Sequence, residues 1–354
     1  MTPEDEPGPV RAEDALDVAR LEPWLSERID GLSGSPEIRQ FSGGASNLTY
    51  LLSYPDRDLV LRRPPPGTKA ASAHDMRREA EIQRRLRPVF PYVPQVLAFC
   101  DDAEVLGSDF YVMERLHGVI LRARGPQQID LTPAAAEGVC EAFVDRLVEL
   151  HQVDVEANGL NDIGRGGGYV ERQIGGWSER YRRARTWNVP RCEYVMSWLA
   201  EHLPRDSGAC VIHNDFRLDN LLLDRTDPRH VVGILDWEMA TIGDPLMDFG
   251  NTLAYWVQAD DDRMMQRFRR QPSNLPGMMT REEMIDRYCE RARIERPSMA
   301  FYEVYGVFRL AVIVQQIYQR YHRKETTNPT FRRYWVMVHF LNRRCRRMIA
   351  SAQV

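Results

Sequence analysis

The ten residues Val211-Ile-His-Asn-Asp-Phe-Arg-Leu-Asp-Asn220 decide the fold class of this 354-residue chain. They begin as an apolar, strand-like run and turn polar at the third residue. A short apolar run, Leu221-Leu-Leu223, follows, and a second strand-like run, Val231-Val-Gly-Ile-Leu-Asp236, ends in a carboxylate. Strand, polar loop, strand and terminal carboxylate in this order predict a loop that presents acidic and amide side chains at fixed spacing.

Three side chains of this stretch suit phosphoryl transfer. His213-x-Asp215 followed by Asn220 reproduces the His-x-Asp-x-x-x-x-Asn pattern of kinase catalytic loops, in which the Asp accepts a hydroxyl proton and the Asn holds Mg2+. Asp236 ends the second strand and adds an oxygen ligand for Mg2+. The alternative is structural, because Asp and Asn also shape turns and cap segments. The joint arrangement favours Asp215 as the base, with Asn220 and Asp236 as metal ligands.

Composition indicates an ordinary globular protein. The chain is 43% hydrophobic and long enough to form two lobes. A net charge of -4 gives no basic footprint for nucleic acid, and no long apolar run indicates a membrane span or signal peptide. We therefore expect a cytoplasmic protein with no nucleic-acid or membrane partner, and the oligomeric state stays open. The six cysteines lack a Cys-x-x-Cys pair, which argues against zinc and redox sites. Residues 1–10 are expected to form a flexible tail.

A glycine-containing turn interrupts the strand character of residues 38–52. Small residues in such a turn let backbone amides and a serine hydroxyl approach phosphate oxygens closely. An ordinary hairpin turn is the alternative, since the full Gly-x-Gly-x-x-Gly spacing is missing. The turn residues that we assign to nucleotide binding are Gly43, Gly44, Ser46 and Asn47.

A strand over residues 58–63 and a helix over residues 73–87 predict an internal ion pair. Period-two alternation places Val60 and Arg62 on one face of the strand. Glu79 falls on the apolar stripe of the helix, where an unpaired carboxylate would cost several kcal/mol. We pair it with Arg62, whose guanidinium fork also suits ATP phosphates. A purely structural pair remains open, as does Arg63 as the residue that faces the nucleotide.

The run Phe110-Tyr-Val-Met-Glu-Arg-Leu-His-Gly118 is an apolar strand that leads into a turn. Backbone groups near Glu114 and Leu116 suit hydrogen bonds to adenine, and Val60 and Met113 suit the apolar walls of its pocket. An ordinary core strand is the alternative, and the run itself does not distinguish the two.

From about Ile38 to the C-terminal helices, the chain resembles the aminoglycoside phosphotransferase and choline kinase family, a small-molecule branch of the protein-kinase-like fold. In particular it resembles the kinase-like domain of the acyl-CoA dehydrogenase family ten and eleven fusion proteins. Two runs carry this likeness, Leu61-Arg-Arg-Pro-Pro-Pro-Gly67 and Ile234-Leu-Asp-Trp-Glu-Met-Ala-Thr-Ile-Gly-Asp-Pro-Leu-Met-Asp248. The resemblance implies an α+β fold with a small nucleotide-binding lobe at residues 11–115, built from an antiparallel sheet and a helix, and a mainly helical lobe at residues 116–354.

The resemblance also implies roles for the matching residues and names the cofactors, ATP and Mg2+. Asp215 is the expected base. Asn220 and Asp236 are the expected Mg2+ ligands. Arg62 is the expected phosphate-binding residue, with Glu79 as its partner. The choice between ATP and GTP stays open.

The segment after Asp236 bears on the substrate. Only seven residues separate Asp236 from Asp244, and no Ala-Pro-Glu motif follows, so a long peptide-docking loop has no room. By the resemblance, Asp244 and Asp248 are expected to brace the catalytic loop. Asn214 stands where many relatives have Gly. A small-molecule acceptor is therefore favoured over a peptide.

Arginine-rich helix patterns favour an anionic acceptor, since polycationic aminoglycosides would need a carboxylate-lined cleft. Solvated arginines paired with glutamates are the alternative. The cationic and polar positions lie within residues 169–185 and at Arg309, Gln315, Gln316, Arg320 and His322.

The resemblance implies phosphorylation of a hydroxyl on a small metabolite, with a hydroxyacyl-CoA or hydroxy acid as the leading acceptor. Two alternatives remain. The first is phosphotransfer to an aminoglycoside or another cationic alcohol, and the second is a non-catalytic nucleotide-binding scaffold.

Overall fold

The computed structural model describes residues 6–41, 47–65, 75–123 and 129–352. The chain divides into two compact units, each described by itself below. The first comprises Met1–Ile120, Glu156–Ile163 and Asn220–Ala240, and the second comprises Leu121–Val155, Gly164–Asp219 and Thr241–Val354. Each unit is assembled from several stretches, whereas the lobe boundary expected at residues 115 and 116 divides the chain once. That boundary remains a prediction.

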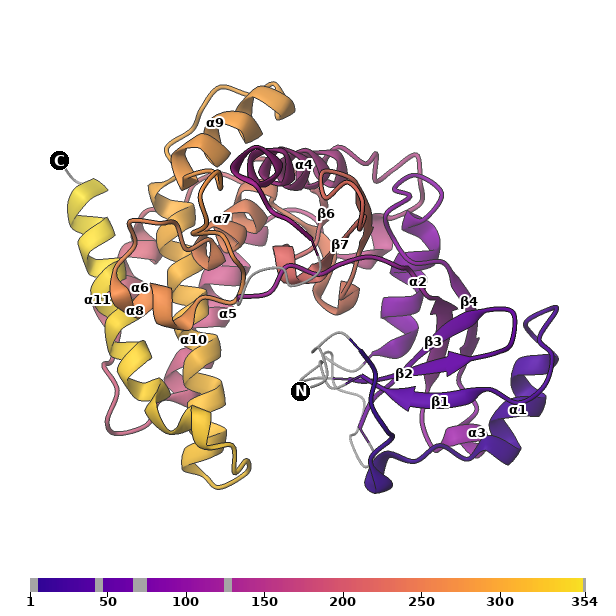
Figure 1. Ribbon diagram of the computed structural model, residues 1–354. Coiled ribbons are helices and arrows are strands. Elements are labelled where there is room, and N and C mark those ends of the chain that lie inside the picture. The colour runs from indigo at the N-terminus through magenta and orange to yellow at the C-terminus, as the bar shows by residue number, and fades with distance from the viewer. Residues whose placement is uncertain (1–5, 42–46, 66–74, 124–128, 353–354) are drawn as a thin grey trace. The chain divides into compact units, whose positions relative to one another are not determined.

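The first unit is built on a five-stranded antiparallel sheet with the strand order β1-β2-β3-β5-β4 (Figure 1). A separate antiparallel pair consists of β7 and β8. The strands are β1 (Glu37–Gln40), β2 (Leu48–Ser53), β3 (Asp58–Arg63), β4 (Val96–Cys100), β5 (Phe110–Glu114), β7 (Leu221–Leu223) and β8 (Val231–Ile234). The helices and 3-10 turns are η1 (Ala12–Asp14), α1 (Val18–Ser26), α2 (Met76–Leu86), α3 (Ala103–Leu106), η3 (Asn161–Ile163) and η5 (Trp237–Met239).

The two faces of the five-stranded sheet pack against different helices. Leu61 of β3 lies in a buried cluster with Trp24 of α1. Val60, its neighbour on the strand, lies in a second cluster with Met76 of α2. Successive side chains of a strand point to opposite faces, so these clusters confirm the alternation predicted for residues 58–63.

Residues 1–5 of the expected flexible tail lie outside the described residues. Gly8 exchanges two backbone hydrogen bonds with Gln40 of β1, at 2.9 and 2.8 Å. The buried Gln40 side chain also donates to Asp14 Oδ2 at 2.8 Å. This part of the N-terminal segment is therefore tied to the edge of the sheet.

The second unit is mainly helical and is organised around α10, which packs against α5, α7 and α11 (Figure 1). Its only pair of described strands, β6 and β9, is antiparallel. The elements are α4 (Pro133–His151), α5 (Tyr169–Ala184), α6 (Glu193–Glu201), β6 (Cys210–Ile212), β9 (Thr241–Gly243), α7 (Pro245–Tyr255), α8 (Arg263–Phe268), α9 (Arg281–Ala292), α10 (Ala300–His322), η6 (Pro329–Arg333) and α11 (Tyr334–Ala352). A further 3-10 turn, η4 (Leu218–Asn220), begins in this unit and ends at Asn220, which is counted with the first unit. Among the described helices of the chain, none combines the length and apolar character that a membrane span requires.

Two glycines set the close packing of α7 against α10. A Cβ atom added to Gly250 would lie 2.5 Å from the Tyr302 carbonyl oxygen, and one added to Gly306 would lie 2.2 Å from the Gly250 carbonyl oxygen. Both distances are far below van der Waals contact, and the opposing atoms belong to the backbone. Only glycine therefore fits at this crossing.

Gly306→Ala is expected to lower the free energy of unfolding by about 1–3 kcal/mol, because the added methyl forces the two helix backbones apart. Urea unfolding of the full chain measures the change. Gly175→Ala is the matched control, since a Cβ at that exposed helix position meets nothing within 4 Å. The control is expected to be neutral or to stabilise by up to about 1 kcal/mol. Equal losses in both variants would contradict the packing argument.

Candidate active site

Arg62 and Glu79 form the predicted ion pair, with 3.4 Å between Nη1 and Oε1. Glu79 is buried on α2 at 2% exposure, and the Tyr111 hydroxyl donates to its Oε1 at 2.9 Å. Gln83 in turn donates to the Tyr111 oxygen at 3.0 Å. Burial opposes the charge on Arg62, but nearby carboxylates, above all Glu79, outweigh burial and raise the pKa of Arg62. The guanidinium is therefore held charged and fixed in direction.

Arg63 lies on the other face of β3. It is buried at 7% exposure and follows Leu61 in the alternation of the strand. Leu61 belongs to the cluster that packs against α1, so Arg63 points away from α2. Arg62, not Arg63, therefore faces Glu79.

Two further carboxylates approach Arg62 from the segment that follows β8. Its Nη2 lies 3.3 Å from Asp236 Oδ1 and 3.9 Å from Glu238 Oε2. The side-chain amide of Asn47 donates to Glu238 Oε2 at 3.1 Å. Glu238 was not among the predicted site residues, although the Asp-x-Glu spacing after an apolar strand is a signal in the sequence. Of the turn residues assigned to the nucleotide, Gly43, Gly44 and Ser46 lie outside the described residues, and Asn47 is brought to this cluster.

The predicted metal ligands Asn220 and Asp236 lie at the same end of the β7–β8 ladder. Leu221 is paired with Ile234, and the Leu235 N–H donates to the Asn220 carbonyl oxygen at 2.8 Å. Asp236 has a φ of 69°, in the left-handed region, and its side chain is 35% exposed. The described residues contain no cluster of three or more His, Cys, Asp and Glu side chains suited to a metal. One amide and one carboxylate oxygen nevertheless fit Mg2+, which usually keeps waters and substrate phosphates as its other ligands.

The residues predicted to surround adenine are placed on and after β5. Val60 is paired with Met113, and both lie in the buried cluster beside α2. The Glu114 N–H donates to the Gln95 carbonyl oxygen at 2.9 Å, so this donor is already used within the sheet. Leu116 packs so closely on β8 that a Cβ at Gly233 would lie 2.3 Å from its Cδ1. Val60 and Met113, the predicted apolar walls, are therefore brought together, while the Glu114 N–H is not available to hydrogen-bond adenine.

In the second unit, Asp248 of α7 holds the backbone of the loop that carries Asp215. Its oxygens accept the His213 N–H at 2.8 Å and the Asn214 N–H at 2.7 Å. His151 lies 3.2 Å away, and Asp248 is fully buried. Burial raises the pKa of Asp248, but the hydrogen bond and charge of His151 outweigh it, so the pKa lies below the ordinary value. Asp248 thus braces the loop, as expected.

Asp244 does not share this contact with the loop. Its Oδ1 accepts the Met247 N–H at 2.9 Å and caps the N-terminus of α7. Its Oδ2 accepts the Ser207 hydroxyl at 2.7 Å. An Asp at this position satisfies helix amides that lack an internal partner. The expectation that Asp244 also braces the catalytic loop is therefore corrected: its described hydrogen bonds support α7 and the segment before β6.

Asn214 takes the left-handed conformation, with a φ of 65°, immediately before Asp215. This region favours glycine and tolerates asparagine. The Tyr169 hydroxyl donates to Asn214 Oδ1 at 3.1 Å, and Arg309 donates to the Asn214 carbonyl oxygen at 2.8 Å. The asparagine side chain therefore adds a hydrogen bond that glycine would lack.

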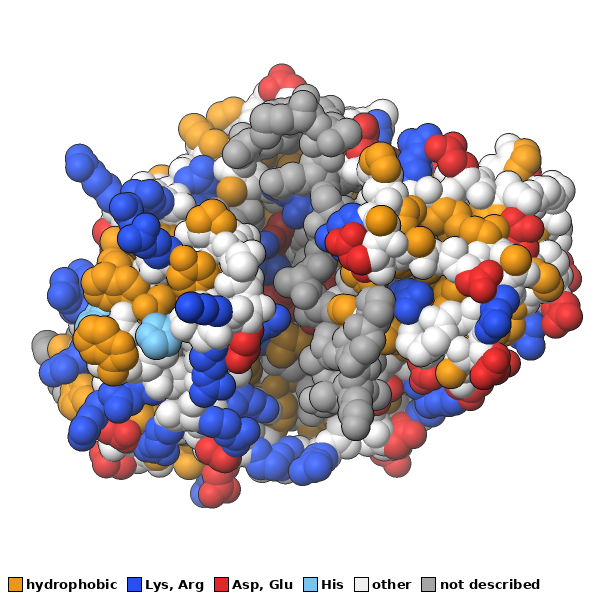
Figure 2. Space-filling view, turned by 90° about the horizontal axis from the view of Figure 1, so that it is seen from below, with side chains coloured by type: hydrophobic (Ala, Val, Ile, Leu, Met, Phe, Trp, Pro, Cys, Tyr) orange, Lys and Arg blue, Asp and Glu red, His pale blue; other side chains and the backbone are white. Residues whose placement is uncertain are grey.

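The cationic and polar helix residues expected to bind an acceptor divide into buried and exposed ones. Arg309 is 2% exposed and stacks on Trp177 at 5.1 Å, and Gln315 is fully buried and donates to the Ala184 carbonyl oxygen. Their proposed contact with an acceptor is corrected, because both belong to the interior of the second unit. Figure 2 shows Lys and Arg side chains over this unit, on the left of the view. The exposed arginines from α10 onward are Arg320, Arg323, Arg332, Arg333, Arg343, Arg346 and Arg347.

Arg217 lies beside the predicted base, a contact that the sequence analysis missed. Its Nη2 is 3.0 Å from Asp215 Oδ2, its Nε is 3.4 Å from Asp219 Oδ1, and its guanidinium stacks on Tyr255 at 4.8 Å. Arg270 reaches the other oxygen of Asp219 at 3.5 Å. A cation two residues after the base was visible in the sequence, but its direction was not. Two arginines thus accompany the two carboxylates of this loop.

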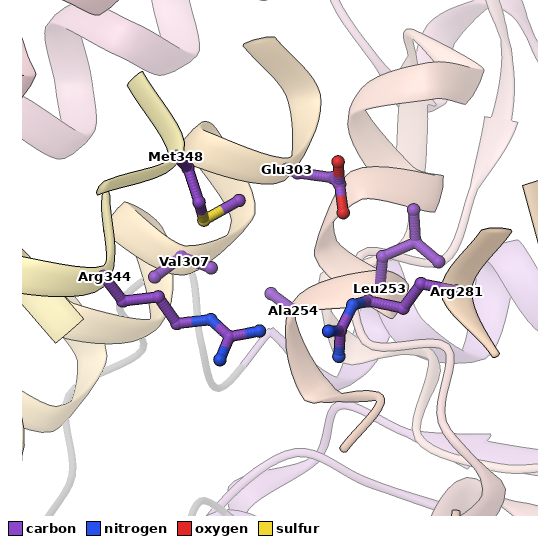
Figure 3. Close-up of a pocket in the computed structure, with 7 residues that line it drawn as sticks. All are labelled: Leu253, Ala254, Arg281, Glu303, Val307, Arg344 and Met348. Carbon is purple, nitrogen blue, oxygen red and sulfur yellow. The ribbon is translucent and has the colours of Figure 1, made fainter. Parts of the chain in front are cut away.

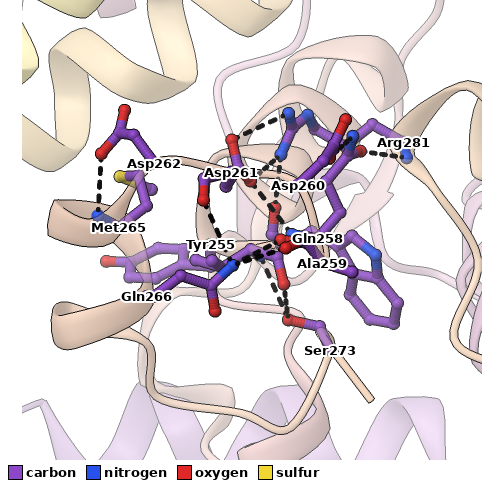
Figure 4. A network of polar contacts seen from close by, with 12 residues as sticks. Tyr255, Gln258, Ala259, Asp260, Asp261, Asp262, Met265, Gln266, Ser273 and Arg281 are labelled. Atoms are coloured by element: carbon purple, nitrogen blue, oxygen red, sulfur yellow. Dashed lines mark hydrogen bonds and ion pairs between the residues drawn. The ribbon is translucent and has the colours of Figure 1, made fainter. Parts of the chain in front are cut away.

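A pocket described in the second unit contains none of the predicted site residues (Figure 3). It is lined by Leu253, Ala254, Arg281, Glu303, Val307, Arg344 and Met348. Its two arginines both bind Asp261, at 2.5 and 2.9 Å, and Figure 4 shows Arg281 reaching that carboxylate. These ion pairs tie α9 and α11 to the loop after α7. We therefore interpret the arginines of this pocket as structural.

Asp248→Asn is expected to lower the free energy of unfolding by about 3 kcal/mol, because it removes the charge that the buried His151 and two N–H groups compensate. The folded-state pKa of Asp248 is depressed, so this stabilisation is fully present above its ordinary pKa of 3.8 and is lost as the pH falls below it. Urea unfolding near neutral pH and near pH ~3 measures both effects. The difference in the free energy of unfolding between wild type and variant should be smaller at the lower pH.

Asp286→Asn is the matched control, because that carboxylate is 61% exposed and pairs with Arg296 at the surface. A surface pair of this kind contributes about 0–1 kcal/mol. A loss in Asp248→Asn no larger than in the control would contradict the bracing role.

Comparison with known proteins gives the family. A model of the phosphotransferase enzyme family matches residues 37–284, more than half of the chain. The acyl-CoA dehydrogenase family member 10 of Mus musculus is 36% identical over 315 residues, covering 88% of this chain and 29% of that protein. The human acyl-CoA dehydrogenase family member 11 is 33% identical over 319 residues, covering 86% and 40%. The chain thus spans well under half the length of these relatives.

Solved structures give the fold. A protein from Ralstonia eutropha, provisionally described as an aminoglycoside phosphotransferase, superposes with a TM-score of 0.77 at 27% identity, covering 94% of this chain and 99% of that one. Choline kinase from Cryptosporidium parvum superposes with a TM-score of 0.65 at 12% identity, covering 95% and 97%, a likeness of fold alone. The predicted protein-kinase-like α+β fold is confirmed, and this chain belongs to the phosphotransferase enzyme family.

Proposed function

We propose that this protein transfers the γ-phosphoryl group of ATP, with Mg2+, to a hydroxyl of a small anionic metabolite. A hydroxyacyl-CoA or hydroxy acid is the leading acceptor. The observation that carries the proposal is the fixed loop around Asp215, which Asp248 braces through buried hydrogen bonds. Asn220 follows Asp215 by five residues, the spacing of a kinase catalytic loop. Membership of the phosphotransferase family supports the reaction class, and the acceptor is the finer part of the proposal.

The first unit would bind the nucleotide and the metal. Arg62, held charged by Glu79, would neutralise phosphate oxygens without having to be reoriented when the nucleotide binds. Asn220 and Asp236 would hold Mg2+, which when bound supplies positive charge to the phosphates. Three carboxylates around one guanidinium leave the cluster of Arg62, Glu79, Asp236 and Glu238 rich in negative charge, which favours a further cation there.

Asp215 would accept the proton of the acceptor hydroxyl as that oxygen attacks the γ-phosphorus. Arg217 Nη2 lies 3.0 Å from Asp215 Oδ2 and would hold the carboxylate in a fixed direction for this proton transfer. Most of the rate enhancement in such reactions comes from positioning and charge neutralisation, because the protein forms no covalent bond to the phosphoryl group.

The charges near Asp215 support an anionic acceptor. Arg217 and Arg270 both approach the loop, through Asp215 and Asp219. Because the two guanidinium groups balance the two carboxylates, the loop carries no excess negative charge that would draw in a polycationic acceptor, and the exposed Arg270 can attract a carboxylate or phosphate group. The names of the relatives, acyl-CoA dehydrogenase family members, support a CoA-linked acid as the first acceptor to test.

The experiment that tests the reaction is ATP consumption with Mg2+ across hydroxyacyl-CoAs, free hydroxy acids, choline-like alcohols, sugars and aminoglycosides. We expect selective turnover of a CoA-linked or free hydroxy acid. Selective turnover of an aminoglycoside would overturn the acceptor assignment while keeping the reaction. Nucleotide binding without turnover of any acceptor would favour the non-catalytic scaffold.

Asp215→Asn is expected to lower kcat by about a hundredfold or more with nearly unchanged nucleotide affinity, because loss of a general base acts mainly in the transition state. Steady-state kinetics on the selected acceptor and calorimetric titration with an ATP analogue measure the two quantities. Asp286→Asn, an exposed carboxylate, serves as the control and should leave both unchanged. A normal kcat in Asp215→Asn would remove Asp215 from the role of base.

Arg270→Gln is expected to lower kcat/KM for an anionic acceptor by about three- to tenfold while leaving neutral acceptors unaffected, since the side chain is 61% exposed and acts through charge. The measurement compares a hydroxy acid with its uncharged methyl ester. Arg229→Gln, at 65% exposure, removes an equal charge that pairs with Asp227 instead and is the control. Equal losses on both acceptors would argue against recognition of the anion by Arg270.

A further inference from the structure

Arg78 of α2 donates to three backbone carbonyl oxygens within the first unit. Its Nη1 lies 3.3 Å from the Glu238 oxygen and its Nη2 lies 3.3 Å from the Ile163 oxygen. Nη2 also donates to the Ala240 carbonyl oxygen. Glu238 and Ala240 follow Asp236 by two and four residues. The Arg78 guanidinium therefore binds the backbone just after the predicted metal ligand.

The segment from Asp236 to Ala240, whose backbone Arg78 binds, has little regular secondary structure. Asp236 takes a left-handed φ of 69°, and the next three residues form the single 3-10 turn η5. Trp237 is buried at 1% exposure and its indole N–H donates to the Ile234 carbonyl oxygen at 2.8 Å. A single 3-10 turn satisfies few of its own carbonyl groups, and partly buried carbonyls need donors from elsewhere. Arg78 supplies those donors for Glu238 and Ala240.

Burial of the charged Arg78 guanidinium is energetically unfavourable, which indicates a role beyond packing. Burial is the main influence on Arg78 and lowers its pKa, although Asp75 and Glu79 oppose this effect. A partly desolvated guanidinium is therefore committed to carbonyl oxygens. Among the described residues, its hydrogen-bond partners all lie in two segments far from α2 in the sequence.

Helix α2 thus reaches the segment of Asp236 through two neighbouring residues. Glu79 acts on the side chain, because it orients Arg62, which contacts Asp236 Oδ1 at 3.3 Å. Arg78 acts on the backbone after Asp236. The direction of a carboxylate depends on the backbone that carries it, and a metal ligand must be held within fractions of an ångström of its working position.

We propose that Arg78 is a positioning residue that fixes the backbone carrying Asp236 and thereby strengthens the binding of the Mg2+–nucleotide complex. The inference rests on the proposed function, in which Asp236 is a metal ligand. It differs from a purely structural role in one measurable respect. Loss of Arg78 should weaken the metal-dependent part of nucleotide affinity more than the metal-free part.

The test is calorimetric titration of the full chain with a non-hydrolysable ATP analogue, with and without Mg2+. In wild type, Mg2+ should strengthen binding. In Arg78→Gln that gain should fall by about tenfold, while the metal-free affinity changes by about twofold or less. Arg78→Lys keeps the charge and a shorter donor, and should recover part of the gain. Thermal unfolding measured in parallel reports any general loss of stability.

Arg77→Gln is the matched control on the same helix. Arg77 is 61% exposed, stacks on Phe99 and pairs with Asp101, so it does not touch the segment of Asp236. An unchanged Mg2+ gain in Arg78→Gln, or the same loss in Arg77→Gln, would overturn the inference. If Arg78→Gln does not fold, Arg78→Lys decides, and a wild-type Mg2+ gain in that variant would overturn it.

The wild-type arm separates this inference from the proposed function. If wild type binds the analogue without any gain from Mg2+, the metal assignment fails and the inference fails with it. If wild type shows the gain and phosphorylates an acceptor while Arg78→Gln behaves like wild type, the proposed function stands and only the role of Arg78 is rejected.

Discussion

The buried carboxylate of Asp248 is the interaction on which the loop of Asp215 depends. A charge inside a protein is stable only when hydrogen bonds and opposite charge replace its lost hydration. Asp248 accepts hydrogen bonds from two loop N–H groups and lies 3.2 Å from Nε2 of His151. The same bonds hold the turn that leads to Asp215, so compensation of one buried charge also fixes the backbone of the site.

Charge compensation also organises the first unit, but there the buried charge is a cation that carboxylates surround. Arg62 is the buried cation, and Glu79, Asp236 and Glu238 approach it from α2 and from the segment after β8. Glu79 alone lies deep in the interior, whereas Asp236 keeps an exposed fraction of 35%. One carboxylate is therefore suited to holding the arginine and another to meeting a ligand. Glu79 lies on α2, and Met76 of the same helix packs against this face of the sheet.

Arginine content by itself was a poor guide to acceptor binding. Arg309 lies in an apolar run of α10, is 2% exposed and supports Asn214, whereas Arg217 lies in a polar loop and contacts Asp215 directly. Helical periodicity says nothing about Arg217, which lies in a loop, and Arg309 lies on a buried side of α10. A guanidinium becomes structural when the carbonyl oxygens around it are buried, and that depends on neighbouring helices.

The sequence by itself determined the fold class, the order of strands around the catalytic loop, and the pairing of Arg62 with Glu79. The fold class came from motifs that resemble a known family, whereas the ion pair follows from local rules, since strand alternation and helical spacing assign each side chain to a face, and a buried charge requires a partner. Only the tertiary structure decided that Asp244 caps α7 instead of bracing the loop, that Glu238 joins Arg62, and that Arg78 binds the backbone after Asp236. Each of these contacts joins residues whose directions are set by packing between distant segments, which no local pattern encodes.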